Sequence, residues 1–149
     1  MPDYYFDDLK PGFRIETEPM PVTEEEIIAF ARQWDPQAFH LDAEAAKKGP
    51  YGGLIASGWQ TVLIMFRRFL DLGLIRESSM GSPGVDELRW YRPVRPGDTL
   101  RMVAEVIESR PSRSKPDRGI IRMRQSAVNQ DGEEVASMIG MLLLRRRPD

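Results

Sequence analysis

Hydrophobic positions after residue 57 repeat with the spacing of an α-helix. Apolar side chains recur there at intervals of three and four residues, which is the period of one helix face. In chain order, these apolar positions are Trp59, Val62, Leu63, Phe66, Phe69 and Leu70. The polar positions between them are Gln60, Arg67, Arg68 and Asp71. Because the polar stripe is narrow, the pattern predicts a helix from about residue 57 to 73 that the rest of the domain encloses.

The start of this helix carries residues that suit a ligand as well as a helix. Ser57 is a good N-terminal cap, and Gly58 has no side chain to keep a ligand away from the backbone. The first N–H groups of a helix have no acceptor within it and lie at the positive end of its dipole. They can therefore stabilise an oxyanion that develops during a reaction. An ordinary cap on a core helix accounts for the same two residues.

The second half of the chain changes to a period of two, which is the period of β-strands. A Ser-, Gly- and Pro-rich stretch at 76–84 comes first and predicts a loop. The segments that follow it are 88–94, 100–106, 121–127 and the nearly continuous apolar run 135–144. Asp131-Gly132 between the last two is a strong hairpin signal. The pattern predicts four strands in succession, which form an antiparallel meander.

The first half of the chain contains one short strand and two further helices. Alternation over 13–17 predicts a strand that Pro19 and Pro21 end. Thr23-Glu24-Glu25-Glu26 is a capping box, and the helix that it opens ends at Pro36. A short helix over 43–48 is capped by Asp42, whereas the segment 35–42 is expected to be a loop or extended chain.

Together these elements predict one α+β domain over residues 1–149, in which a curved antiparallel β-sheet wraps around the long central helix. A single sheet with one long helix leaves its edges and part of its inner face uncovered. Dimerisation is the simplest way to cover them, so we expect a homodimer or a dimer of dimers.

Composition excludes several classes of function. The net charge of −2 argues against a nucleic-acid partner, and the absence of cysteine excludes disulfides and thiol catalysis. A single histidine without cysteine makes a zinc site a poor interpretation. The long helix is too short and too charged to span a membrane. The first residues show no basic or apolar targeting pattern, so we expect a cytoplasmic protein.

The sole histidine, His40, is the best candidate for proton transfer. Its unperturbed pKa of about 6.5 suits acid–base catalysis at neutral pH. Asp35 precedes it by five residues in a polar segment that contains Pro36, so the two side chains can converge. A carboxylate can orient an imidazole, raise its pKa or act as a second acid or base. The alternative is a helix-end cap beside a surface imidazole.

The order of these motifs resembles that of the MaoC-like acyl dehydratases, the hot-dog-fold family that includes the (R)-specific enoyl-CoA hydratases. The resemblance covers nearly the whole chain and rests on three segments. These are Asp35 to His40, Gly53 to Gly58, and Arg92-Pro93-Val94-Arg95-Pro96-Gly97-Asp98. It implies a hot-dog fold and the reversible addition of water to a trans-2-enoyl-CoA, or a related acyl thioester, to give the 3-hydroxyacyl thioester.

The same resemblance implies roles for individual residues. It assigns proton transfer to Asp35 and His40, and polarisation of the thioester carbonyl to the N–H of Gly58. This chain departs from the family pattern at two places: Gln37 replaces the usual Asn, with Pro36 two positions earlier than the usual Pro, and Ser57 replaces the usual His. Coenzyme A enters as part of the substrate, and no separate cofactor is implied.

Further residues are candidates for substrate binding. Gln37 could hold the water or orient the histidine. We also assign to this group Phe39, Tyr51, Ser57 and Trp59, together with Val62 and Leu63 as candidate acyl-pocket lining. Core packing explains Trp59, Val62 and Leu63 equally well. In the basic segment 110–118, Arg113 and Lys115 could meet the phosphates of coenzyme A, although a solvated hairpin loop is the simpler interpretation.

Two other functions remain open at this point. A hot-dog thioesterase would use the same fold and the same thioester, but its carboxylate usually lies in the central helix. The chain offers only Asp71 there, far from the helix start. A non-catalytic acyl-thioester-binding module would need neither Asp35 nor His40.

Overall fold

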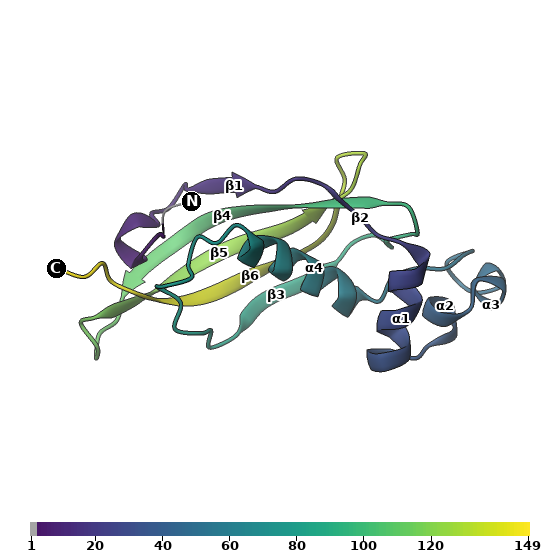
Figure 1. Ribbon diagram of the computed structural model, residues 1–149, viewed down its shortest axis with the longest axis horizontal. Helices are drawn as coiled ribbons and strands as arrows, with labels where there is room; N and C mark the ends of the chain where they lie inside the picture. Colours follow the sequence, from purple (N-terminus) through teal and green to yellow (C-terminus); the bar gives the residue numbers. More distant parts are fainter. Residues whose placement is uncertain (1–2) are drawn as a thin grey trace.

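The structure is a computed structural model that describes residues 3–149, and it is dominated by one antiparallel sheet (Figure 1). The strands are β1 (Arg14–Glu16), β2 (Met20–Pro21), β3 (Val85–Trp90), β4 (Thr99–Pro111), β5 (Arg118–Val128) and β6 (Glu134–Arg145). The order across the sheet is β1-β4-β5-β6-β3, and β2 pairs with another part of β4. Since β4, β5 and β6 are consecutive neighbours, the predicted meander is confirmed.

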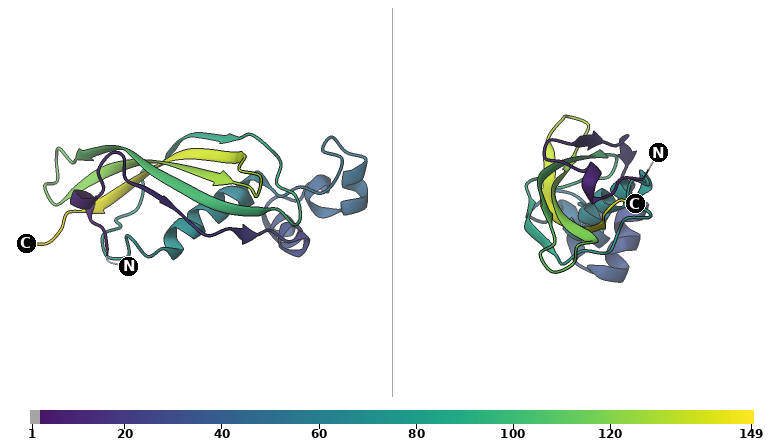
Figure 2. Two further views of the ribbon diagram at one scale, coloured as in Figure 1. Left: turned by 90° about the horizontal axis from the view of Figure 1, so that it is seen from above. Right: turned by 90° about the vertical axis from the view of Figure 1, so that its left-hand side faces the viewer.

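The helix α4 (Gly58–Asp71) packs against β4, β5 and β6, and the curved sheet passes around one side of it (Figure 2). Alternate residues of the long strands face this helix and are buried, as at Met102, Val106, Ile121 and Met123. Met65 and Phe69 of α4 meet them and are 1% exposed. The predicted arrangement, a curved sheet around a long helix in an α+β domain, is confirmed.

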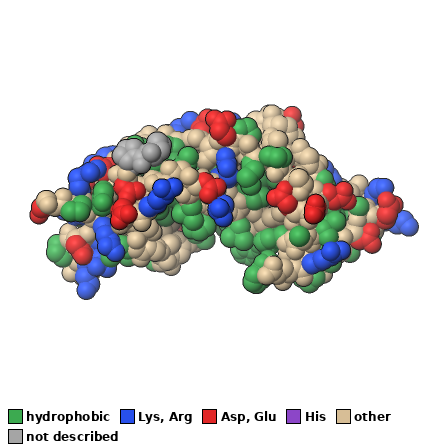
Figure 3. Space-filling view, in the orientation of Figure 1, with side chains coloured by type: hydrophobic (Ala, Val, Ile, Leu, Met, Phe, Trp, Pro, Cys, Tyr) green, Lys and Arg blue, Asp and Glu red, His purple; other side chains and the backbone are tan. Residues whose placement is uncertain are grey.

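The sheet covers only one face of α4, and the predicted enclosure of this helix is therefore wrong within one chain. Gln60, which the pattern placed on the polar side, is 6% exposed and faces inward. The outward face instead carries four large apolar side chains, Trp59, Leu63, Phe66 and Leu70, with exposed fractions of 41–56%. Hydrophobic side chains accordingly gather over α4 on the surface in Figure 3. Nothing in the described part of the chain, residues 3–149, covers this apolar face.

Three helices gather at the end of the sheet where α4 begins, and they position the site described below. These are α1 (Glu24–Trp34), α2 (Ala38–Leu41) and α3 (Ala43–Lys47). The capping box of α1 is confirmed, since Thr23 Oγ1 accepts from the Glu26 N–H at 3.1 Å. Asp42 caps α3 as predicted. The segment 35–42 is not a plain loop, because it contains the single turn α2.

β4 continues to Pro111, beyond the predicted 100–106, and β3 begins at Val85 and ends at Trp90 rather than covering 88–94. The pairing ends there because the N–H groups of Tyr91 and Arg92 both point to Val135 O, and Pro93 has no N–H. The chain then crosses to the start of α4, where Val94 O accepts from the Ala56 N–H at 2.8 Å. This crossing brings residues 90–94 to the site. No helix within residues 3–149 is long and apolar enough to cross a membrane.

Candidate active site

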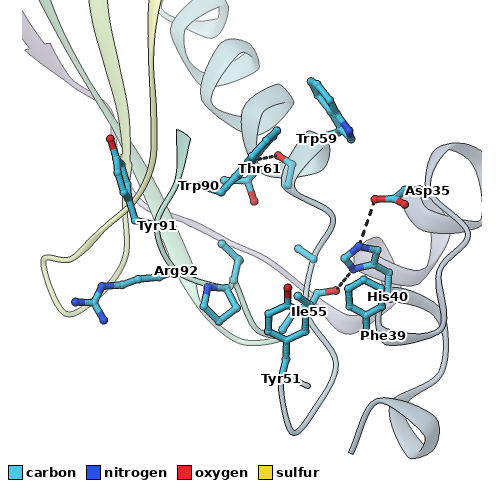
Figure 4. Close-up of a pocket in the computed structure, with 14 residues that line it drawn as sticks. Asp35, Phe39, His40, Tyr51, Ile55, Trp59, Thr61, Trp90, Tyr91 and Arg92 are labelled. Atoms are coloured by element: carbon cyan, nitrogen blue, oxygen red, sulfur yellow. Dashed lines mark hydrogen bonds and ion pairs between the residues drawn. The ribbon is translucent and has the colours of Figure 1, made fainter. Parts of the chain in front are cut away.

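A cavity of about 350 Å³ opens between the start of α4, the turn α2 and the segment after β3. The residues that line it come from four parts of the chain, as the close-up in Figure 4 shows. They are Asp35, Phe39, His40, Tyr51, Ile55, Ala56, Gly58, Trp59, Thr61, Trp90, Tyr91, Arg92, Pro93 and Val94. The structure therefore brings Asp35, His40 and Gly58, which the sequence singled out separately, to one cavity.

The ring of His40 is held by a hydrogen bond at one nitrogen and by stacking on one face. Its Nδ1 lies 2.7 Å from Ile55 O, and since a carbonyl can only accept, Nδ1 carries the proton. One face of the imidazole stacks on Phe39 at a centroid distance of 4.4 Å. His40 is only 4% exposed, which corrects the view of it as part of a polar surface loop. The other ring nitrogen, Nε2, is thereby directed toward Asp35.

Asp35 ends helix α1, and its carboxylate is held by several donors. Oδ2 lies 3.3 Å from His40 Nε2 and accepts from Ser57 Oγ at 2.7 Å. Oδ1 accepts from Gln37 Nε2 at 2.6 Å. Burial alone would raise the pKa of Asp35, but the hydrogen bonds from Gln37 and Ser57 and the neighbouring His40 hold it below its ordinary value of 3.8. Asp35 is therefore a carboxylate at neutral pH.

Gly58 is the first residue of α4, and its N–H has no acceptor within the helix. Ser57 caps the helix as predicted, because its Oγ accepts from the Trp59 N–H at 3.2 Å. Trp90 Nε1 donates to Gly58 O at 2.8 Å. The indole also lies so close that a Cβ on Gly58 would be 2.5 Å from Trp90 Nε1. A side chain at position 58 would therefore require the indole or the start of α4 to move.

The other predicted binding residues divide into three groups. Phe39, Tyr51 and Trp59 line the cavity, and Phe39 stacks on Tyr51 as well as on His40. Gln37 and Ser57 do not line it, but both hold Asp35. Val62 and Leu63, named as possible acyl-pocket lining, are not among the lining residues.

Arg113 and Lys115 belong to the turn between β4 and β5, at the end of the sheet away from α1, α2 and α3 (Figure 1). Within one chain they lie apart from the cavity. Their role in binding coenzyme A stays a prediction.

Trp90 and Thr61 line the cavity but were not predicted to do so. Trp90 ends an edge strand, and its sequence pattern is that of any half-exposed strand residue. Its contact with Gly58 joins positions 32 residues apart, for which a single sequence gives no signal. Thr61 lies on the inward face of α4, one turn after the cap, and is 2% exposed.

A sequence model of the MaoC like domain matches residues 9–128, more than half of the chain. The chain belongs to the MaoC-like dehydratase family. It is 31% identical to the uncharacterized protein YdeM of Bacillus subtilis over 140 residues, covering 94% of this chain and 98% of YdeM. The MaoC-like dehydratase from Rhodospirillum rubrum has a similar structure, with a TM-score of 0.91, 38% identity and coverage of 98% and 99% of the two chains.

A third relative has a more informative name but a shorter match. The 3-hydroxyacyl-thioester dehydratase Z of Mycobacterium tuberculosis is 28% identical over 88 residues, which is 58% of this MaoC-like chain and 58% of that protein. The match to the family confirms the resemblance seen in the sequence, and the match to the Rhodospirillum rubrum structure confirms the hot-dog fold.

In this MaoC-like chain, Asp35 and His40 lie on the same cavity as the first residue of α4. Asp35 Oδ2 and His40 Nε2 lie 3.3 Å apart, and Gly58, whose N–H has no acceptor within α4, lines the same cavity. No group of three or more potential metal ligands gathers anywhere in residues 3–149. Asp35 and His40 are side chains that can transfer protons, and an N–H at the start of a helix can donate to a carbonyl oxygen.

Proposed function

We propose that this chain is an acyl thioester hydratase and dehydratase, which adds water reversibly to a trans-2-enoyl thioester and forms the 3-hydroxyacyl thioester. The observation that carries the proposal is the joint placement of Asp35, His40 and Gly58 on one cavity. Membership in the MaoC-like dehydratase family supports it, and so does the similarity to a 3-hydroxyacyl-thioester dehydratase. A cytoplasmic location stays a prediction.

The pair Asp35 and His40 can carry both proton transfers of the reaction. The water loses one proton to the pair while its oxygen bonds to C3 of the enoyl group. The pair returns one proton to C2, so it ends the cycle in its starting state. Nδ1 of His40 is engaged by Ile55 O, so Nε2 and the neighbouring carboxylate are the atoms that exchange these protons.

Besides the two proton transfers, the reaction needs a group that stabilises negative charge on the substrate, and Gly58 can supply it. As water adds to C3, negative charge develops on the thioester carbonyl oxygen. The Gly58 N–H, at the positive end of the 14-residue helix α4, can donate to that oxygen. A donor placed in this way typically contributes about 3–4 kcal/mol to the stability of the transition state.

Aromatic side chains suggest where the acyl chain binds. Phe39, Tyr51 and Trp59 give the cavity an apolar wall next to the acid–base pair. We propose coenzyme A as the carrier of the thioester, with no further cofactor. Arg113 and Lys115 are the proposed contacts for its phosphates. Because they lie at the far end of the sheet, they would contact coenzyme A that is bound at the cavity of a partner chain.

We further propose a homodimer, or a pair of such dimers. The apolar face of α4 is exposed, and β3 forms an edge of the sheet with no neighbour on its outer side among residues 3–149. Unpaired edges and large apolar patches are usually covered in a stable protein. A second copy of the chain can cover both features at once.

The thioesterase alternative is not supported by the position of Asp71. This carboxylate lies at the last residue of α4 and is ion-paired with Arg67 at 2.8 Å. It does not line the cavity. No carboxylate on the central helix therefore faces the proposed substrate.

The direct test is hydration of crotonyl-CoA and longer 2-enoyl-CoAs, followed by loss of absorbance of the conjugated thioester. We expect turnover with no release of free coenzyme A. A thioesterase would release the free thiol, also from saturated acyl-CoAs. A binding module would retain affinity for acyl-CoA but show no turnover, and either result would contradict the proposal.

A further inference from the structure

The hydroxyl of Ser57 is completely buried, with an exposed fraction of 0%. Its oxygen accepts from the Trp59 N–H at 3.2 Å, which makes it the N-terminal cap of α4. Its single proton is donated to Asp35 Oδ2 at 2.7 Å. A hydroxyl has only one proton to donate. Ser57 therefore has no donor left for a substrate, and it does not line the cavity.

This hydrogen bond joins two helix ends that are 22 residues apart. Asp35 is the residue that ends α1, and Ser57 is the residue that opens α4. Asp35, one member of the proposed acid–base pair, lies at the end of α1, and Gly58 lies at the start of α4. The Ser57 hydroxyl is thus a direct polar link between the groups that transfer protons and the group that polarises the carbonyl.

The same hydrogen bond limits how the carboxylate of Asp35 can turn. Gln37 holds Oδ1 at 2.6 Å, while Ser57 and His40 meet at Oδ2. Without Ser57, the imidazole, at the longer distance of 3.3 Å, would be the one polar partner left to Oδ2 among residues 3–149. The carboxylate could then rotate away from His40 Nε2. A misplacement of reacting groups by about 1 Å can lower the rate by about 100-fold.

We propose that Ser57 is a positioning residue, whose hydroxyl holds the Asp35 carboxylate against His40 and in fixed relation to the first turn of α4. It acts through Asp35 and not by contact with the substrate. This inference rests on the proposed hydratase function for its kinetic consequences, but its effect on Asp35 is independent of any activity.

The first test is kinetic and uses Ser57→Ala, which removes the hydroxyl without adding volume. We expect kcat to fall by roughly 10- to 100-fold, with KM within about twofold of the wild-type value. The acid limb of the pH profile should move to higher pH, because the loss of a hydrogen bond to the charged form raises the pKa of Asp35. Ser57→Thr retains the hydroxyl and should restore most of kcat.

The matched control is Ser78→Ala. Ser78 is also 0% exposed and donates its hydroxyl proton to a backbone carbonyl, that of Tyr4. Its loss should lower the melting temperature about as much as Ser57→Ala does, while kcat and the pH profile stay unchanged. A merely structural role for Ser57 predicts the same behaviour for both variants.

The second test needs no substrate and therefore separates this inference from the proposed function. The carboxyl ¹³C signal of Asp35, assigned by its loss in Asp35→Asn, is titrated in the wild-type protein and in Ser57→Ala. We expect the pKa of Asp35 to be higher in the variant. The ring signals of His40, the sole histidine, should also shift at constant pH. If the pKa of Asp35 is the same in both proteins, or if Ser57→Ala raises KM at unchanged kcat, the inference is wrong. Absence of hydration by the wild-type protein would overturn the proposed function alone.

Discussion

Trp90 fills the space beside the Cα of Gly58 and donates a hydrogen bond of 2.8 Å to the carbonyl of the same residue. The indole thus holds the first turn of α4 and leaves no room for a Cβ at its start unless one of the two moves. Trp59 packs edge-on against Trp90, with the ring centroids 5.2 Å apart. The proposed oxyanion donor is therefore positioned by a contact between the edge strand and the central helix.

Gly58→Ala tests this contact. Its Cβ would lie 2.5 Å from Trp90 Nε1, so the indole or the helix start must move. We expect a loss of about 1–3 kcal/mol in the free energy of unfolding, as is typical of overpacking. If the N–H is displaced, kcat should fall by roughly 10²–10³-fold. Urea unfolding and steady-state kinetics measure the two effects.

The control is the double variant Gly58→Ala/Trp90→Ala. The stability losses of its two changes should not add, because the second change removes the clash. Additive losses would contradict the contact.

Asp35→Asn and His40→Asn should each lower kcat for hydration of 2-enoyl-CoA by about 10²–10⁴-fold. The double variant should lose little more than either single one, because the two groups act as a pair. Normal hydration by His40→Asn would refute the site, since the chain contains no second histidine.

Asp35→Asn and His40→Asn should also differ in their free energy of unfolding. His40 is buried and bonds to Ile55 O, so its replacement should cost roughly 1–3 kcal/mol, as for other buried donors that are removed. A histidine in a polar loop would instead be replaced at little cost in stability, so the burial of His40 decides this expectation. Thermal unfolding of both variants measures the difference.

The lowered pKa of Asp35 predicts a pH dependence of stability. Above the ordinary value of 3.8 the group is ionised in the folded and the unfolded chain, and its stabilising contribution is complete. As the pH falls below 3.8 the unfolded chain takes up the proton first, and the contribution is lost as the pH passes through the lower folded pKa. The difference in free energy of unfolding between the wild-type protein and Asp35→Asn should therefore be constant near neutral pH and shrink below pH 3.8. A difference that begins to shrink well above that pH would mean that the pKa is raised.

The proposed dimer predicts that a charge on the outer face of α4 separates the chains. Phe66→Glu should sediment as a monomer at micromolar concentration, because the glutamate would be buried without a partner. Ile107→Glu is the matched control: Ile107 is 43% exposed, against 41% for Phe66, but it lies on β4. We expect this control to remain dimeric. A wild-type protein that is monomeric at the same concentration would rule out the dimer.

Replacement of both Arg113 and Lys115 by glutamine should raise KM for acyl-CoA while kcat stays the same, because remote phosphate contacts contribute equally to ground and transition states. The difference in KM should shrink as salt is added, since exposed charges are screened. A fall in kcat at constant KM would assign the hairpin another role.

The secondary structure could be predicted from the sequence because its signals are local. The capping box at Thr23, the alternation in the last three strands and the hairpin at Asp131-Gly132 each depend on residues within a few positions of one another. The errors on the central helix have one cause. Gln60 and Leu63 were placed on the wrong sides of α4, because periodicity shows that a helix has two faces but not which one the sheet covers.

The sequence by itself determined the fold class and the candidate residues Asp35, His40 and Gly58, because the type of each residue restricts the chemistry that it can perform. Only the tertiary structure decided how they act. The proton on His40 Nδ1 depends on the carbonyl of Ile55, the pKa of Asp35 depends on Ser57 and Gln37, and the fit at Gly58 depends on Trp90. Except for Gln37, these partners lie 15 to 32 residues away along the chain. Hydrogen bonds and steric contacts act over a few ångströms in space, so these partners became identifiable only once the chain had folded.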